Sequence, residues 1–233
     1  DPHTWTHTPV GTPRAVVVTV IHGVTATAHC IGVTYGGVAM TLVAEGNDTA
    51  TEPGAAQVWF LGANIPTGNQ TVSADLDSAT ADDIQFTSMT WTAAADCAVQ
   101  ASAVVEQNIA NPQATLAFGG FSCVSVCALY GGGAAPTSYT SLADQTRVSD
   151  HDFGAFSAVV DRLTAAQTAD DTIGYTAAVD DVGFAALAFR ELVPITGTLS
   201  KPLPLSLSAA GAVAVQGSFS KALALTLTAA GTV

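Results

Sequence analysis

The chain has 233 residues, of which 48% are hydrophobic and 11% are charged. This apolar content is enough for one all-β domain with an appendage, and it argues against a disordered chain. Nineteen acidic residues face six basic ones, giving a formal net charge of −13. So acidic a surface repels phosphate and anionic headgroups, so we expect neither nucleic-acid binding nor adsorption to a membrane.

Short apolar runs separated by turn residues recur along the first 194 residues. Gly36-Gly37, Pro66 to Asn69 and Gly131 to Gly133 supply turns. No apolar run approaches the length that a bilayer-spanning helix needs. This pattern predicts an all-β fold, a jelly-roll-like sandwich of two sheets. The predicted strands are 15–21, 32–35, 39–44, 57–61, 70–74, 84–91, 98–105, 114–118, 123–129, 138–141, 173–177 and 183–192.

One segment of this domain, residues 155–163, has an ambiguous pattern. Phe156, Val159, Val160 and Leu163 have roughly helical spacing, whereas the flanking residues suit a strand. We favour the strand. Because the chain begins at Asp1 and not at a methionine, we also expect a leader or a few residues to precede it.

Two copies of a twenty-residue sequence end the chain, with Lys201 and Lys221 at equivalent positions. In each copy, leucines alternate with small or polar residues before an Ala-Ala-Gly turn. One short copy cannot bury such a leucine face alone, so we expect it to pack on another surface. We therefore divide the chain into a sandwich domain, 1–194, and an assembly segment, 195–233. The predicted interface residues are Leu203, Leu205, Leu207, Leu223, Leu225 and Leu227.

Four cysteines, Cys30, Cys97, Cys123 and Cys127, are too few for a disulfide-dense fold. Cys123 and Cys127 would face one side of a strand about 13 Å apart, too far apart to form a disulfide with each other. Buried free thiols fit the sequence, and so do one or two disulfides in other pairings. The spacing does not predict a zinc site.

Catalytic motifs are absent from the sequence: it has no nucleophile elbow, phosphate-binding loop, dinucleotide fingerprint or zinc-protease helix. Ser149-Asp150-His151-Asp152 has the residue types of a hydrolase triad. Neighbours on one loop cannot reach the triad geometry among themselves, so we interpret the segment as a solvated loop. We predict that the protein is not an enzyme and carries no cofactor.

Several other residues are of types that bind metals or stack on sugars, and each also has a simpler structural explanation. His3 and His7 flank Trp5 and would project from one face of a strand; we favour a strand leaning on the sandwich over a metal site. His22 and His29 bracket a loop with nothing else to complete a site. Acidic residues at strand ends lack the spaced pattern of a calcium loop, so we interpret them as solvated charge. The tryptophans Trp5, Trp59 and Trp91 belong either to the core or to a sugar-stacking platform. The acidic residues at strand ends are Asp75, Asp77, Asp82, Asp83, Asp170, Asp171, Asp180 and Asp181.

The first 193 residues resemble a β-sandwich domain of bacteriophage virion proteins and of some secreted bacterial proteins. The similarity lies in Thr12-Pro-Arg-Ala-Val-Val-Val, Gly32-Val-Thr-Tyr-Gly-Gly-Val-Ala-Met-Thr-Leu, Val58-Trp-Phe-Leu, Ile65-Pro-Thr-Gly-Asn-Gln-Thr-Val and Ala185-Ala-Leu-Ala-Phe-Arg-Glu-Leu. The final repeats are similar to repeats of phage tail and capsid-associated proteins. These motifs are turns and strands, so the resemblance implies a fold and a setting but no catalytic residues. The four cysteines and the lysine-free first domain depart from the pattern.

The resemblance implies a structural virion protein of a tailed phage, a capsid decoration or fibre-type subunit at the particle surface. We expect it to assemble through the C-terminal leucines with other copies of itself, as a trimer, and with capsid or tail proteins. The alternative is a secreted carbohydrate-binding or adhesive module, in which the sandwich loops bind glycan, with tryptophan or tyrosine stacking and Ca²⁺. Exposure of Trp5 or Trp91 beside carboxylates would favour this alternative.

Overall fold

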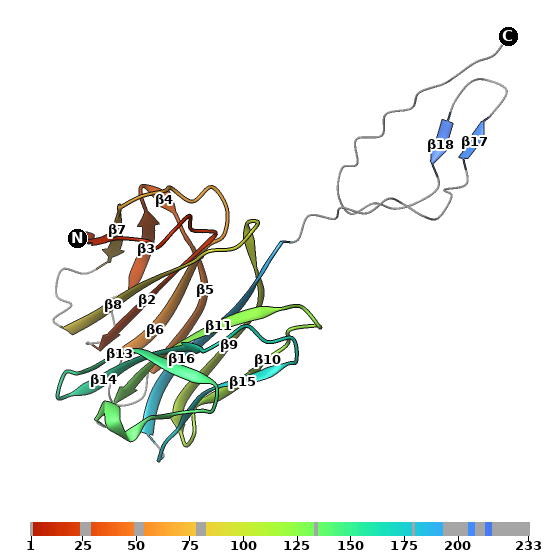
Figure 1. Ribbon diagram of the computed structural model, residues 1–233. Coiled ribbons are helices and arrows are strands. Elements are labelled where there is room, and N and C mark those ends of the chain that lie inside the picture. The colour runs from red at the N-terminus through yellow and green to blue at the C-terminus, as the bar shows by residue number, and fades with distance from the viewer. Residues whose placement is uncertain are drawn as a thin grey trace, which may run out of the picture. The chain divides into compact units, whose positions relative to one another are not determined.

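Figure 1 shows the computed structural model of the chain. It describes residues 2–23, 29–48, 54–77, 83–132, 135–178, 180–192, 205–207 and 213–215. The chain divides into two compact units, residues 1–193 and residues 194–233.

The described residues of the first unit form four antiparallel sheets. The first outer sheet has the order β1 (Pro2–His7), β7 (Gln70–Leu76), β3 (Cys30–Tyr35), β4 (Val38–Ala39). The first inner sheet has the order β5 (Thr41–Asp48), β6 (Gly54–Leu61), β2 (Ala15–Gly23), β8 (Asp83–Trp91). The second inner sheet has the order β13 (Gln145–Asp152), β14 (Phe156–Leu163), β11 (Cys123–Gly132), β16 (Asp180–Glu191), β9 (Cys97–Ile109). The second outer sheet has the order β10 (Gln113–Leu116), β15 (Asp171–Thr176), β12 (Thr140–Ser141), and a short 3₁₀ helix, Pro136–Ser138, precedes β12.

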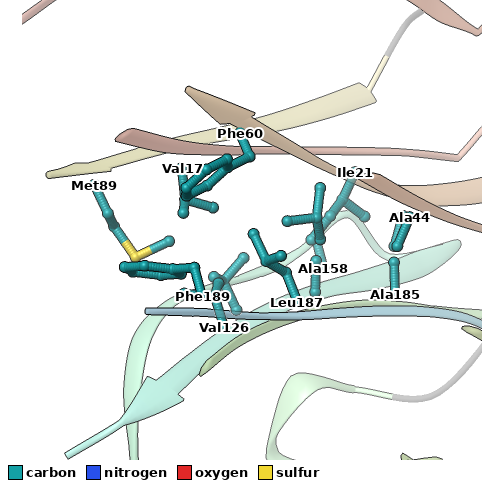
Figure 2. Packing of buried hydrophobic residues seen from close by; sticks show 14 of the residues in the cluster. Val17, Ile21, Ala44, Phe60, Met89, Val126, Ala158, Ala185, Leu187 and Phe189 are labelled. Carbon is teal, nitrogen blue, oxygen red and sulfur yellow. The ribbon is translucent and has the colours of Figure 1, made fainter. Parts of the chain in front are cut away.

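In the described part of this unit, three apolar cores hold these sheets in a stack of four layers. Core 1 lies between the first outer and first inner sheets, core 2 between the two inner sheets, and core 3 between the second inner and second outer sheets. Figure 2 shows core 2, where Val17 and Ile21 of β2 approach Leu187 of β16. Each inner sheet therefore has a core on both of its faces.

Burial on both faces explains the near-continuous apolar runs of the inner strands. Along β2, Val16 and Val18 point into core 1, while Val17 and Ile21 point into core 2. Side chains alternate between the faces of a strand, so a strand between two cores needs apolar residues at consecutive positions. Such runs usually indicate parallel sheets, but here the four-layer stack produces them in antiparallel ones.

The two halves of this unit share one topology. In the first half, β1, β3 and β7 lie in the outer sheet, and β2, β5, β6 and β8 form the inner sheet. In the second half, the outer sheet is formed by β10, β12 and β15, and the corresponding places in the inner sheet are taken by β11, β13, β14 and β16. The orders β1-β7-β3 and β10-β15-β12 correspond, as do β5-β6-β2-β8 and β13-β14-β11-β16. Among the described residues, two strands lack an equivalent in the other half: β4 beside β3 in the first half, and β9 beside β16 in the second.

The prediction of an all-β sandwich is confirmed, and the stack contains more sheets than the two expected. Residues 156–163 form strand β14, as the sequence favoured. The interpretation of Ser149–Asp152 as a loop is wrong, because these residues belong to β13. Polar residues outnumber apolar ones in β13, an edge strand whose last three side chains are exposed, so it lacked an apolar signal.

A close approach between the inner sheets makes Gly46 of β5 a sensitive position. A Cβ added to Gly46 would collide with the backbone of Phe184 in β16, which cannot rotate away. We expect Gly46→Ala to lower the free energy of unfolding by about 1–3 kcal/mol, the usual cost of overpacking. Urea denaturation measures this difference. The control is Gly32→Ala in β3, where an added Cβ meets nothing within 4 Å; an equal loss in both variants would contradict the packing argument.

Two short strands are described in the second unit. β17 (Leu205–Leu207) pairs antiparallel with β18 (Val213–Val215). Both belong to the first copy of the twenty-residue repeat. An isolated two-stranded hairpin is marginally stable at best in water.

Candidate functional site

The N-terminal strand carries the first predicted group, His3, Trp5 and His7, and it packs these side chains onto β8. The rings of His3 and Trp5 lie 5.4 and 5.0 Å from that of Phe86. Trp5 Nε1 donates to Ser88 Oγ at 3.0 Å, and His7 Nδ1 lies 2.9 Å from the same oxygen. The three side chains share one face, as predicted, and this face covers the inner sheet.

The triad-like residues of β13 do not form a catalytic arrangement. Ser149 Oγ is 2.8 Å from Thr87 Oγ1 of β8, and the exposed His151 ring packs edge-on against Phe153. Asp150 Oδ2 accepts from Arg147, while Asp152 Oδ1 accepts from the Gly154 amide. Each side chain thus has a structural partner other than its triad counterpart.

The structure does bring His22 and His29 together, and it adds residues that the sequence analysis missed. We call His22, His29, Glu45, Gln57 and Asp77 the His22 cluster. The two imidazole rings are edge-to-face with centroids 5.7 Å apart, and His29 Nδ1 is 3.1 Å from Glu45 Oε1. Gln57 Nε2 donates to Glu45 Oε1 at 3.0 Å, and Asp77 Oδ1 accepts from the His29 amide. Gln57, a single polar residue within the apolar run of β6, was the available signal.

His22 is the most constrained member of this cluster. Its side chain is 3% exposed, and neither ring nitrogen has a hydrogen-bond partner among the residues that the structure describes. Burial lowers the pKa of His22 to about 4; the charge of His29 adds to this effect, and Glu45 and Asp77 oppose it. The imidazole is therefore neutral at pH 7 and costly to protonate in the folded chain.

Arg147 and Asp161 form a second polar cluster, which lies at the edge of core 3. Asp161 of β14 is fully buried, and Arg147 Nε of β13 donates to its Oδ1 at 2.7 Å. The other guanidinium nitrogens donate to the Tyr139 carbonyl, Ser141 Oγ and Asp150 Oδ2. The pKa of Asp161 is raised by burial, and the hydrogen bond with Ser141 and the charge of Arg147 limit the rise.

The surroundings of this ion pair are phenolic and apolar. The Arg147 guanidinium carbon lies 5.6 Å from the centroid of the Tyr175 ring. Tyr175 accepts a hydrogen bond from the Cys127 thiol, and Tyr139 donates to Asp180. Burial raises the pKa of Tyr175 well above its usual range. The arrangement joins β13 and β14 to Ser141 of the second outer sheet.

All four cysteines are free and buried, so of the two alternatives the structure has free thiols. Cys123 and Cys127 both point into core 3, which confirms that they share a face. Burial raises the pKa of Cys30 and of Cys97 to about 11. These thiols are protonated at neutral pH and poorly suited to nucleophilic chemistry.

Three of the carboxylates predicted at strand ends, Asp77, Asp170 and Asp180, accept hydrogen bonds from backbone amides. Asp170 Oδ1 accepts from the Phe118 amide at 2.8 Å, and Asp180 Oδ1 accepts from the Asp181 amide. Among the described residues, no three His, Cys, Asp or Glu side chains are placed to hold a metal ion. Asp82 lies outside the described residues.

The tryptophans are not arranged as an exposed platform. Trp59 is buried, with its Nε1 donating to Gln57 Oε1. Trp91 is half-buried against Phe189 of core 2, with ring centroids 4.9 Å apart, and Trp5 is half-buried on Phe86. The exposure that would favour a sugar-stacking role is therefore not found at any of the three.

The predicted interface leucines are described only in part. Leu205 and Leu207 belong to β17, and nothing is described of their side chains. Leu203, Leu223, Leu225 and Leu227 lie outside the described residues. Their role in assembly stays a prediction.

Comparison of the chain with protein-family models, with curated proteins and with solved structures found no match. Among the described residues, no helix is long and apolar enough to cross a membrane.

Proposed function

We propose that this protein is a structural subunit of a tailed-phage virion, a capsid decoration or fibre-type protein at the particle surface. It contributes a rigid β-stack and assembles through its C-terminal repeats with other copies, as a trimer, and with capsid or tail proteins. The observation that carries this proposal is the division of the chain into a large β-stack and a small separate unit of repeats.

The charges of the two units support an assembly role. Residues 1–193 contain all nineteen acidic residues and four arginines, for a formal charge of −15. The repeat unit contains two lysines and no acidic residue, so its charge is +2. The acidic stack keeps a crowded particle soluble, and the weakly basic apolar unit is suited to contact acidic neighbours.

The β-stack itself supports a structural role over catalysis. Three apolar cores and closely packed sheets make a robust body, and its polar clusters are made of structural partners. The virion setting rests on the resemblance of the turn and repeat motifs described above. The half-buried tryptophans give the carbohydrate-binding alternative no specific support.

The proposal predicts that assembly depends on the repeats. We expect the full chain to be a trimer or larger in solution and a chain ending at Pro194 to be monomeric, as measured by light scattering coupled to size exclusion. A full-length variant with Leu223, Leu225 and Leu227 replaced by serine serves as a milder test. If the full chain is a monomer, the assembly role is wrong, and glycan and calcium binding become the next measurements.

A further inference from the structure

The two halves of the first unit differ in the described residues at one inner-sheet edge, where the second half has β9. In the second half, β9 covers the outer edge of β16 over twelve residue pairs, from Asp180–Ile109 to Glu191–Cys97. The strand equivalent to β16 in the first half is β8. In the part of the chain that the structure describes, β8 pairs only with β2.

The flanking strands are equivalent as well. On one side of β8 lies β1, whose Trp5 and His7 contact Ser88. On the other side lies β13, where Ser149 contacts Thr87. In the second half, β10 and β5, the equivalents of β1 and β13, lie beside β16 and extend over β9. We call the outer edge of β8, with β1 and β13 beside it, the β8 edge.

Apolar side chains border the β8 edge on both sides. Ile84, Phe86 and Trp5 are half-buried at the margin of core 1. Val148 and Phe153 are half-buried at the margin of core 2. A strand that paired with β8 would complete the burial of these side chains and would satisfy the backbone groups of an otherwise open edge.

The strand β9 shows which sequence such a position accepts. Its Ala101, Ala103 and Val105 alternate along one face and pack into core 3, on the side of the second outer sheet. Its opposite face carries polar residues such as Ser102 and Glu106. The equivalent occupant of the β8 edge would alternate in the same way, with its apolar face toward β1.

We propose that residues 221–228 of a second copy of this chain pair with the β8 edge, an inference that rests on the proposed assembly function. This segment, Lys-Ala-Leu-Ala-Leu-Thr-Leu-Thr, is free of proline and nearly as long as the nine-residue β8. Leu223, Leu225 and Leu227 face β1, while alanine and threonine face the hydroxyls of Thr87 and Ser149. The equivalent stretch of the first copy is interrupted by Pro202 and Pro204, which cannot donate backbone hydrogen bonds.

Charge complementarity favours the same occupant. Asp150 and Asp152 are exposed on β13 beside β8, and residues 1–193 carry a formal charge of −15. The incoming segment contains Lys221 and no acidic residue. In this arrangement each copy donates one strand and accepts another, a head-to-tail contact that closes into a ring when the rotation between copies permits.

Photo-crosslinking in the full-length chain tests this inference. Benzoylphenylalanine replaces His3 of β1 or His151 of β13, two exposed positions beside the β8 edge, and Val10, which is 89% exposed outside any strand, is the control. Unlabelled and isotope-labelled chains are mixed, irradiated and digested. We expect cross-links from positions 3 and 151, but not from position 10, to peptides spanning residues 221–228, joining unlabelled to labelled chains.

Matched lysine variants separate this contact from general attraction to the acidic unit. We expect Lys221→Glu to reduce the cross-linked fraction about tenfold, the effect of about 1.4 kcal/mol in binding, and Lys201→Glu, at the equivalent position of the first copy, to reduce it much less. Equal effects, cross-links within one chain, or cross-links to other segments in an assembled protein would overturn this inference alone. A monomeric full chain would overturn the proposed function, and this inference with it.

Discussion

Replacing Arg147 with methionine is expected to lower the free energy of unfolding by about 3–5 kcal/mol at pH 7, because it leaves a buried carboxylate without its ion pair. Asp161 has no exposed surface and receives the Arg147 Nε at 2.7 Å. The same guanidinium also joins β13 to the carbonyl of Tyr139. Urea denaturation followed by tryptophan fluorescence measures the loss.

Two further variants identify the cause of this loss. Replacing both Arg147 and Asp161, with methionine and leucine, removes the buried charge, and we expect it to be less damaging than Arg147→Met alone. Arg162→Met in the neighbouring strand removes a guanidinium bonded to the Leu163 carbonyl and should cost less than about 1 kcal/mol. If the double variant is the least stable of the three, the packing of the arginine matters more than the ion pair.

The second large effect is expected from acid, through His22. Its pKa is about 4 in the folded chain and about 6.5 when unfolded. Between these values the unfolded chain binds more protons than the folded chain, so stability falls as the pH falls. The contribution is fully present above pH 6.5 and is lost on approaching pH 4. A shift of this size corresponds to roughly 3 kcal/mol.

Denaturation curves at pH 7.5 and pH 4.5 for the natural chain and for His22→Leu measure this contribution. The variant cannot take up the proton, so we expect it to lose roughly 2–3 kcal/mol less than the natural chain over this interval. Leucine also removes the two ring nitrogens that lack a hydrogen-bond partner among the described residues, so the variant should be at least as stable at pH 7.5. His151→Leu, at an exposed position of β13, is the control. An unchanged acid response in His22→Leu would assign the loss to carboxylates instead.

The strands are where sequence reasoning was most successful. Alternation and turn residues act within a few positions, so Gly36-Gly37 and the apolar run of β2 could be interpreted without knowledge of the rest of the chain. The twenty-residue repeat could likewise be recognised from the sequence alone. β13 was missed because its residues are mostly polar, and its strand conformation depends on pairing with β14.

The rest of the fold depends on pairing between segments that are far apart in the chain. The apolar run of β2 was compatible with burial on one face or on both, and packing against the second inner sheet, whose strands begin at Cys97, buries the second face with Val17 and Ile21. The sequence does not show that His22 and His29 meet. The packing of β2, β3, β5 and β6 brings them together and places Glu45 and Gln57 beside them. Strand formation depends on near neighbours, whereas sheet order and polar clusters depend on contacts between distant segments, for which this single sequence contains no direct signal.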